Sequence, residues 1–182
     1  STPEDAESVD VNAVMRETLS FLSHQMMSAR IELDTRLPDG IPFIRGHAGK
    51  LQQVFTNILI NSLQAFRTEG GRVGVETSVA DSWVTVRLSD TGEGISTDNL
   101  DKIFEPFFTT KEIGQGTGLG LSVTYGLVKD MGGNISVESS IGQGTTFTVS
   151  FPALNMMDSV AGAPARQPEK DKENSANARS SE

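Results

Sequence analysis

Asp90-Thr-Gly-Glu-Gly94 and, further along the chain, Gly114-Gln-Gly-Thr-Gly-Leu-Gly-Leu121 are the stretches that decide the fold of this sequence. Their glycines let the backbone approach a flat ring or a phosphate, where a Cβ would collide with the ligand. Asp90 ends an apolar stretch and, when ionised, can only accept hydrogen bonds. It therefore favours a base with an exocyclic amine, as in adenine, over guanine, which carries a carbonyl at that position. The pattern indicates that the chain binds ATP.

Taken singly, each stretch also fits an ordinary turn, because glycine pairs and Asp-Thr-Gly are common in turns. The two standard phosphate fingerprints are absent: no G-x-x-x-x-G-K-[ST] occurs, and 114–120 reads G-x-G-x-G-x-G rather than G-x-G-x-x-G. The chain is expected to turn helical just past Gly120, so free N–H groups and the positive end of the helix dipole can face phosphates. A phosphate site in this chain is therefore built differently from those two.

Apolar residues recur at three- and four-residue steps between His47 and Phe66, which predicts a long helix with one buried face. That face consists of Leu51, Val54, Phe55, Ile58, Leu59, Leu63 and Phe66. A second stripe, Gln53, Asn57 and Asn61, has the four-residue spacing that stacks side chains along a helix. It is either a solvated polar face or a row of amide oxygens for Mg²⁺ and the phosphates that this ion bridges.

Several stretches resemble, in the same order, the conserved boxes of bacterial sensor histidine kinases. The asparagine, first glycine, phenylalanine and second glycine boxes correspond to Asn57-Ile-Leu-Ile-Asn61-Ser-Leu-Gln-Ala65, Asp90–Gly94, Phe104-Glu-Pro-Phe-Phe-Thr-Thr-Lys111 and Gly114–Leu121. Gly142-Gln-Gly-Thr-Thr-Phe147 resembles the closing segment of the same domain. The resemblance runs from about Val11 to Pro152 and looks closest to the nitrogen-regulation and dicarboxylate-sensing type.

The resemblance implies the Bergerat ATP-binding fold, an α/β (α+β) two-layer sandwich in which a mixed, mostly antiparallel sheet packs on three helices. It implies ATP and Mg²⁺ as ligands, with Asn57, Asn61 and Lys111 as catalytic residues and Asn61 and Asn57 as metal ligands. The implied ATP-binding residues are Asn61, Asp90, Gly92, Gly94, Ile95, Phe104, Phe107, Lys111, Gly114, Gly116, Thr117, Gly118, Leu119, Gly120 and Thr145.

The segment between Asp98 and Gly116 is expected to form a lid. Its phenylalanines fit a protein core equally well. However, a proline and the run Thr109-Thr-Lys-Glu-Ile-Gly-Gln-Gly116 indicate a long loop with a glycine hinge, which is typical of lids. By the resemblance, Phe104 and Phe107 anchor this lid and Lys111 reaches the phosphates. Many relatives carry a phosphate-contacting Lys where this chain has Gln64.

The resemblance further implies transfer of the γ-phosphate of ATP to a histidine on a helical dimerisation domain. Neither His24, in Ser-His-Gln-Met, nor His47, in Gly-His-Ala-Gly, lies in the H-E-x-x-x-P context of a phosphoacceptor. The chain is therefore expected to be a catalytic fragment of a protein-histidine kinase. Its expected partners are the histidine-containing dimerisation domain of the same parent and, indirectly, a response regulator.

Two other functions stay open at this point. Gyrase-like or mismatch-repair-like ATPases activate water with a Glu where this chain has Asn57, so a carboxylate base is missing from that position. This difference favours a kinase over an ATPase. A module that binds ATP without transferring its phosphate is the third possibility.

Composition agrees with one such domain, since 182 residues with 36% apolar side chains supply a single core. The expected boundaries are a polar lead over 1–9, the ATP-binding domain over 10–153 and a disordered tail over 154–182. A net charge of −9 argues against nucleic acid as a partner. No apolar run or leader pattern predicts a membrane span or signal peptide. The absence of cysteine suits the cytoplasm, and the fragment is expected to be monomeric in isolation.

Local patterns predict the remaining elements. Helices are expected over 10–29 and 119–131, in addition to the asparagine-bearing helix. Strands are expected over 30–37, 42–45, 72–79, 82–90, 135–138 and 145–151, with the two strands around Ala80-Asp81 forming a hairpin.

Overall fold

The structure is a computed structural model that describes residues 7–66, 70–109 and 118–154. Its elements, in chain order, are β1 (Glu7–Val9), α1 (Val11–Ser28), β2 (Ile31–Arg36), β3 (Ile44–Gly46), α2 (Ala48–Gln64), β4 (Gly71–Ala80), β5 (Trp83–Asp90), α3 (Thr97–Leu100), α4 (Gly120–Asp130), β6 (Asn134–Ser140) and β7 (Gly144–Pro152). The helices and strands predicted from local patterns are therefore present, with ends that differ by a few residues.

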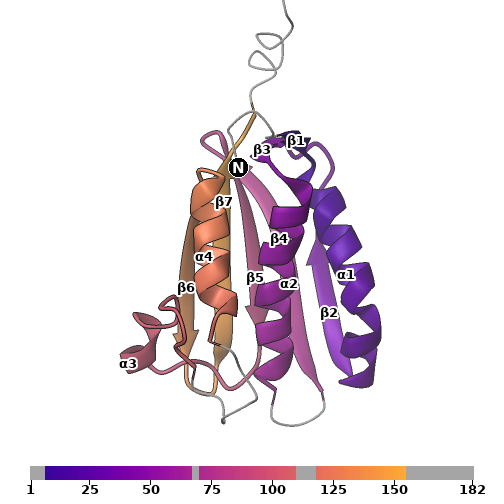
Figure 1. Ribbon diagram of the computed structural model, residues 1–182. Helices are drawn as coiled ribbons and strands as arrows, with labels where there is room; N and C mark the ends of the chain where they lie inside the picture. The colour runs from indigo at the N-terminus through magenta and orange to yellow at the C-terminus, as the bar shows by residue number, and fades with distance from the viewer. Residues whose placement is uncertain (1–6, 67–69, 110–117, 155–182) are drawn as a thin grey trace, which may run out of the picture.

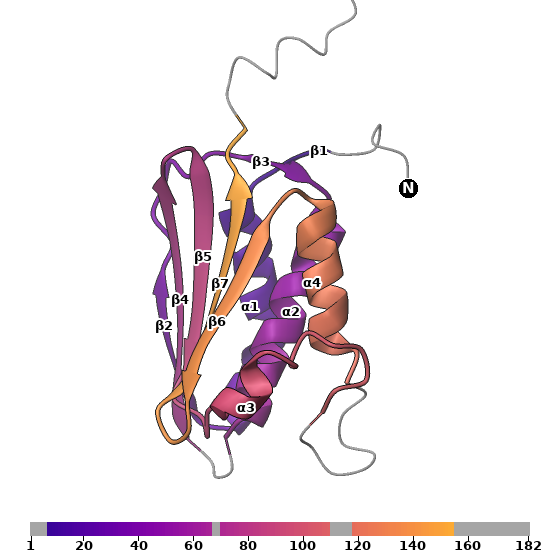
Figure 2. The same ribbon diagram turned by 90° about the vertical axis from the view of Figure 1, so that its left-hand side faces the viewer.

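The molecule has two layers. One layer is a five-stranded sheet in the order β2-β4-β5-β7-β6, in which β2 and β4 run parallel and the other neighbours run antiparallel. Helices α1, α2 and α4 lie side by side on one face of this sheet (Figure 1), and the view along the layers separates sheet from helices (Figure 2). The expected two-layer sandwich with a mostly antiparallel sheet is confirmed.

The core lies between the two layers. It is formed by apolar residues that recur with the period of a strand in the sheet and with the period of a helix in α2. Along β5, Val84, Val86 and Leu88 are buried while the residues between them are more exposed, as strand alternation requires. The central helix α2 buries the opposing face, with Leu51, Val54, Phe55, Ile58 and Leu59 inaccessible to solvent. This is the apolar stripe predicted for the asparagine-bearing helix, and it holds the second, polar stripe at a fixed orientation.

Helix α1 is fixed to the sheet by polar contacts as well as apolar ones. The Asp10 carboxylate caps its first turn by accepting from the Ala13 N–H at 3.0 Å. Asn12 is buried, donates to the Pro38 carbonyl at 2.8 Å and accepts from the Thr77 hydroxyl at 2.8 Å. A buried amide satisfied on both sides holds α1 in one position over β4.

Two predicted boundaries are corrected by the structure. Residues 7–9 belong to the fold rather than to a polar lead, because they pair antiparallel with β3 and Val9 is buried. Leu154 also belongs to the fold, since its N–H donates to the Phe43 carbonyl at 2.7 Å. The rest of the predicted tail, 155–182, lies outside the described residues. Within them, no helix combines the length and apolar character that crossing a membrane requires.

Candidate functional site

The candidate site lies at one end of the sandwich, the lower end in Figure 1. Strand β5 ends there at Asp90, and the antiparallel register sets Asp90 opposite Thr145 at the start of β7. The last turn of α2 and the first turn of α4 reach the same end of the molecule (Figure 1). Segments far apart in the sequence, including three of the four resembling boxes, therefore meet at this end.

Asp90 is nearly inaccessible to solvent, with 7% of its surface exposed. Its Oδ1 accepts hydrogen bonds from the N–H groups of Gly92, at 2.9 Å, and Thr145, at 3.3 Å. Burial raises the pKa of the Asp90 carboxyl, while these two N–H groups and the nearby Ser62 hydroxyl act in the opposite direction. Both backbone bonds fall on one oxygen, so the second oxygen, Oδ2, is left to accept from a ligand.

The glycines after β5 allow the loop to pack closely on its neighbours. A Cβ at Gly92 would lie 2.6 Å from the Ala65 Cβ, at the end of α2. At Gly94 a Cβ would overlap the backbone carbonyl of Ser140, and the backbone φ is +74°, which favours glycine. The glycines expected to face the nucleotide therefore also hold the loop against α2 and β6.

Ser139 is a residue of this site that the sequence analysis missed. Its hydroxyl accepts from the Ile95 N–H at 2.8 Å, donates to the Gly144 carbonyl at 2.7 Å and lies 3.0 Å from the Thr145 hydroxyl. It thereby joins the loop after β5 to the start of β7, where the Asp90 partner Thr145 lies. Nothing in the local sequence around a serine on a polar strand indicates this role.

The asparagine stripe lies against the start of α4. The Asn57 Nδ2 donates to the Gly120 carbonyl and to the Thr124 hydroxyl, both at 3.1 Å. The Thr124 hydroxyl donates its own hydrogen to the Gly120 carbonyl at 2.8 Å, so it can only accept from Asn57. The amide nitrogen of Asn57 is therefore committed to α4, and its oxygen points away from these two groups.

Asn61 lies one turn further along α2, half-buried, and Gln53 lies one turn before Asn57 and is exposed. Asn57 and Asn61 thus lie one turn apart, toward the end of α2 at which the site lies. Amide oxygens are acceptable ligands for Mg²⁺, which also takes water and phosphate oxygens. The donor set at this position fits a magnesium ion shared with a phosphate.

The segment before α4 is joined to the segment after α3 by one backbone contact. The Phe107 N–H donates to the Gly118 carbonyl at 2.9 Å, and both residues have a positive φ, +68° and +64°. A Cβ at Gly118 would lie 2.5 Å from the Phe107 carbonyl carbon. Leu119 follows, half exposed, and Gly120 begins α4. The contact joins the middle of the predicted lid to the residues just before α4.

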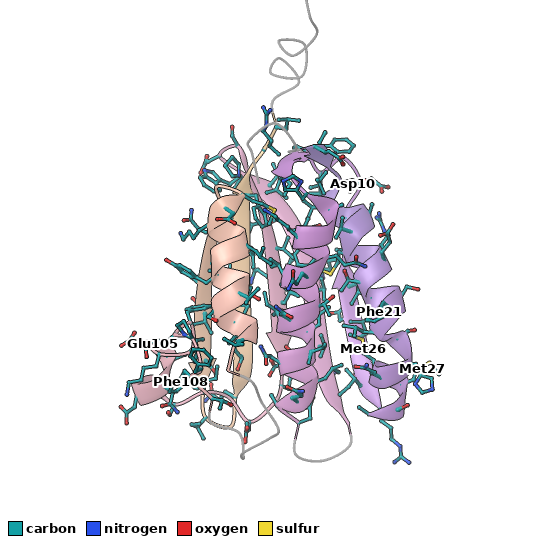
Figure 3. The ribbon with its side chains drawn as sticks, in the orientation of Figure 1. Asp10, Phe21, Met26, Met27, Glu105 and Phe108 are labelled. Carbon is teal, nitrogen blue, oxygen red and sulfur yellow. The ribbon has the colours of Figure 1, made fainter. Side chains whose placement is uncertain are left out.

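The two predicted lid anchors differ in the orientation of their side chains. The Phe104 ring packs against Tyr125 of α4, with the ring centroids 5.5 Å apart. The Phe107 side chain is 76% exposed and its backbone has a positive φ, and the prediction that these two residues anchor a lid stays a prediction. Phe108 packs against the core, and Figure 3 labels it, with Glu105, in the segment beside α4. The predicted site residues Lys111, Gly114, Gly116 and Thr117 lie outside the described residues.

Fold and site together define a class: a two-layer domain in which segments resembling nucleotide-binding boxes converge at one end of a mixed, mostly antiparallel sheet. Residues 46–155 match the family described as "Histidine kinase-, DNA gyrase B-, and HSP90-like ATPase". The chain belongs to this family, and the resemblance to the catalytic domain of sensor histidine kinases is confirmed.

Among curated proteins, the chain is 38% identical over 146 residues to "Sensor histidine kinase ZraS" of Escherichia coli (strain K12), covering 80% of this chain and 31% of that protein. It is 37% identical over 183 residues to "Sensor kinase CckA" of Brucella abortus (strain 2308), covering 92% of this chain and 19% of the relative. The chain therefore spans less than a third of the length of either relative.

Solved structures agree. The chain matches the crystal structure of full-length ShkA in complex with AMPPNP with a TM-score of 0.73 and 29% identity, over 83% of this chain and 32% of ShkA. It matches the nucleotide-free catalytic domain of histidine kinase ThkA with a TM-score of 0.73 and 26% identity, over 82% of this chain and 96% of that domain. The match thus covers nearly all of the ThkA catalytic domain.

Proposed function

We propose that this chain binds ATP with Mg²⁺ and transfers the γ-phosphate to a histidine on a dimerisation domain of the same parent protein. The observation that carries the proposal is the buried Asp90 carboxylate, which keeps one oxygen for a ligand at the point where the resembling boxes converge. The structural relative ShkA, crystallised with AMPPNP, supports an adenine nucleotide as the ligand.

The base would be read by Asp90. Oδ2 would accept from the exocyclic amine of adenine, while the Gly92 and Thr145 N–H groups hold the carboxylate through Oδ1. A carboxylate oxygen at that point repels the carbonyl of guanine. The site would therefore select ATP over GTP.

The phosphates would lie toward the start of α4, because the first N–H groups of a helix have no acceptor within the helix itself. Asn61 and Asn57 would hold the metal through their amide oxygens, and the metal would neutralise charge on the phosphates when bound. The predicted contact of Lys111 with phosphate oxygens remains part of this proposal. The protein would thus contribute mostly positioning of ATP and of the attacking group.

A kinase fits this site better than an ATPase does. Asn57 occupies the position where related ATPases carry the Glu that activates water, and an amide cannot act as a base at neutral pH. Its nitrogen is also held by Gly120 and Thr124. A neutral imidazole needs no such base, because it already carries a lone pair.

The partners follow from this chemistry. A histidine-containing dimerisation domain would present the acceptor, and a response regulator would receive the phosphate from that histidine. The relative ThkA has been crystallised in complex with the response regulator TrrA. We further propose that the domain works in the cytoplasm, where ATP is supplied, and that the parent is of the nitrogen-regulation and dicarboxylate-sensing type.

The direct test is transfer in trans. With γ-labelled ATP and Mg²⁺, the isolated chain should fail to label itself but should label a separately supplied dimerisation domain of its parent. The product should be acid-labile and base-stable, as phosphohistidine is. Robust self-labelling would show that the acceptor is misassigned, rapid release of ADP without acceptor would favour an ATPase, and binding without transfer would favour a nucleotide-sensing module.

The metal assignment predicts a separable defect. In Asn61→Ala, ATP binding should lose its dependence on Mg²⁺, while adenosine binding stays nearly unchanged, because adenosine has no phosphates for the metal to bridge. Calorimetric titration with ATP in the presence and absence of Mg²⁺, and with adenosine, measures both effects.

The matched control is Gln53→Ala, which removes an exposed amide from the same stripe two turns before Asn61. This variant should respond to Mg²⁺ as the wild type does. An equal Mg²⁺ response in Asn61→Ala and the wild type would show that the stripe is only a polar face.

A further inference from the structure

Helix α2 carries a buried polar atom that stands out among the described residues. Ser62 is 2% exposed, and its Oγ is the one buried side-chain polar atom there that has no hydrogen-bond partner. Leaving a buried hydroxyl unpaired destabilises the fold, and alanine would fit a helix better. A buried polar group without a partner needs an explanation. One explanation is that its hydrogen bond forms only when a ligand binds.

Ser62 lies in the last turn of α2, which packs on the loop that follows Asp90: the Ala65 carbonyl accepts from the Glu93 N–H at 2.9 Å, and a Cβ at Gly92 would lie 2.6 Å from the Ala65 Cβ. The Ser62 hydroxyl acts to lower the pKa of the Asp90 carboxyl, as a neighbouring donor does, and it makes no hydrogen bond in the structure. The two backbone donors, Gly92 and Thr145, both reach Oδ1. Ser62 is therefore the side chain that can still bond to the carboxylate from the side of α2.

Charged groups on the neighbouring elements do not take this role. Arg72 of β4 pairs with Glu32 on the exposed side of the sheet at 3.1 Å, and neither it nor Glu93, in the loop after β5, is among the groups that shift the pKa of Asp90. Apart from burial and two fixed N–H groups, the Ser62 hydroxyl is what remains in the described residues to orient this carboxylate.

We propose that Ser62 is a positioning residue for base recognition, whose hydroxyl completes a hydrogen bond to the Asp90 carboxylate when adenine binds and so holds Oδ2 toward the exocyclic amine. The inference rests on the proposed function, because it assumes that Asp90 reads the base. It adds a residue that reaches the base only through another side chain.

The test pairs a protein variant with a ligand variant. Ser62→Ala should bind ATP about 5- to 10-fold more weakly than the wild type, the size of one hydrogen bond to a charged group partly offset by other contacts. With purine riboside triphosphate, which lacks the amine that Oδ2 accepts from, the two proteins should bind alike. In an Asp90→Asn background, Ser62→Ala should likewise cause little further loss, because its effect passes through the carboxylate.

Two further variants separate the hydroxyl from packing. Ser62→Cys fills the same space with a weak donor and should behave as Ser62→Ala does. Ser89→Ala removes the neighbouring hydroxyl on β5, which points to the opposite face of the sheet, and should bind ATP as the wild type does.

The possible outcomes test the role of Ser62 separately from the proposed function on which it rests. Equal losses for ATP and the amine-free analogue, or additive losses with Asp90→Asn, would reduce Ser62 to a structural residue and overturn the inference alone. Full ATP affinity in Ser62→Ala would overturn it as well. A wild-type protein that binds no adenine nucleotide would remove both the proposed function and the inference.

Discussion

Gly118→Ala should lower the rate of phosphotransfer to a supplied dimerisation domain by about 100-fold, the scale expected when reacting groups shift by about 1 Å. The new Cβ would lie 2.5 Å from the Phe107 carbonyl carbon, and a φ of +64° costs a non-glycine residue about 1 to 2 kcal/mol. The bond from the Phe107 N–H to the Gly118 carbonyl joins the middle of the predicted lid to the residues just before α4. Breaking it should misplace the lid and the phosphates together.

Gly126→Ala is the matched control for this prediction. Gly126 lies within α4, the helix that begins just after Gly118, and a Cβ there would meet nothing within 4 Å. Alanine should stabilise the helix by about 0.5 to 1 kcal/mol and leave transfer unchanged. Transfer is measured as acid-labile label on the acceptor, and thermal melting verifies that both variants fold. Wild-type transfer by a folded Gly118→Ala would contradict the role given to this contact.

Asp90→Asn should weaken ATP binding by about 1.5 to 3 kcal/mol, or roughly 10- to 100-fold, the value of a hydrogen bond to a charged group. The Gly92 and Thr145 N–H groups require an oxygen at the Oδ1 position. The amide nitrogen of the variant would then occupy the Oδ2 position, where its hydrogens oppose those of the adenine amine. Calorimetry with ATP and with GTP measures the effect and the selectivity.

The control for this variant is Asp81→Asn, the same substitution in the exposed turn between β4 and β5, where asparagine tolerates the positive φ. It should leave ATP affinity unchanged. Unchanged affinity in Asp90→Asn, or wild-type binding of GTP as tight as of ATP, would exclude Asp90 as the residue that reads the base.

Elements with a strong local pattern were predictable from the sequence. The buried face of α2 repeats at helical spacing over several turns, and the hairpin of β4 and β5 alternates on both sides of a short turn. Strand β1 escaped prediction because it has three residues, of which Val9 alone is buried. Strand β1 pairs with β3, which lies far along the chain, so no local sequence pattern predicts this pairing.

The orientation of the Phe107 side chain could not be predicted for the same reason. Whether an aromatic side chain points inward depends on the backbone at that residue, and the positive φ of Phe107 accompanies its contact with Gly118 across the predicted lid. Phe108, its neighbour, packs on the core instead. A sequence motif identifies the aromatic cluster but not which member turns inward.

From the sequence by itself, the ordered boxes supplied the resemblance that implied the family and the two-layer fold, and residue type and spacing singled out Asp90 and the asparagine pair. The tertiary structure alone decided how the elements bring these residues together: Asn57 toward α4, Ser139 across to the loop after β5, and the last turn of α2, which carries Ser62, against the loop after Asp90. Such contacts join elements tens of residues apart. They depend on sheet register and helix packing, which are properties of the whole chain rather than of any segment.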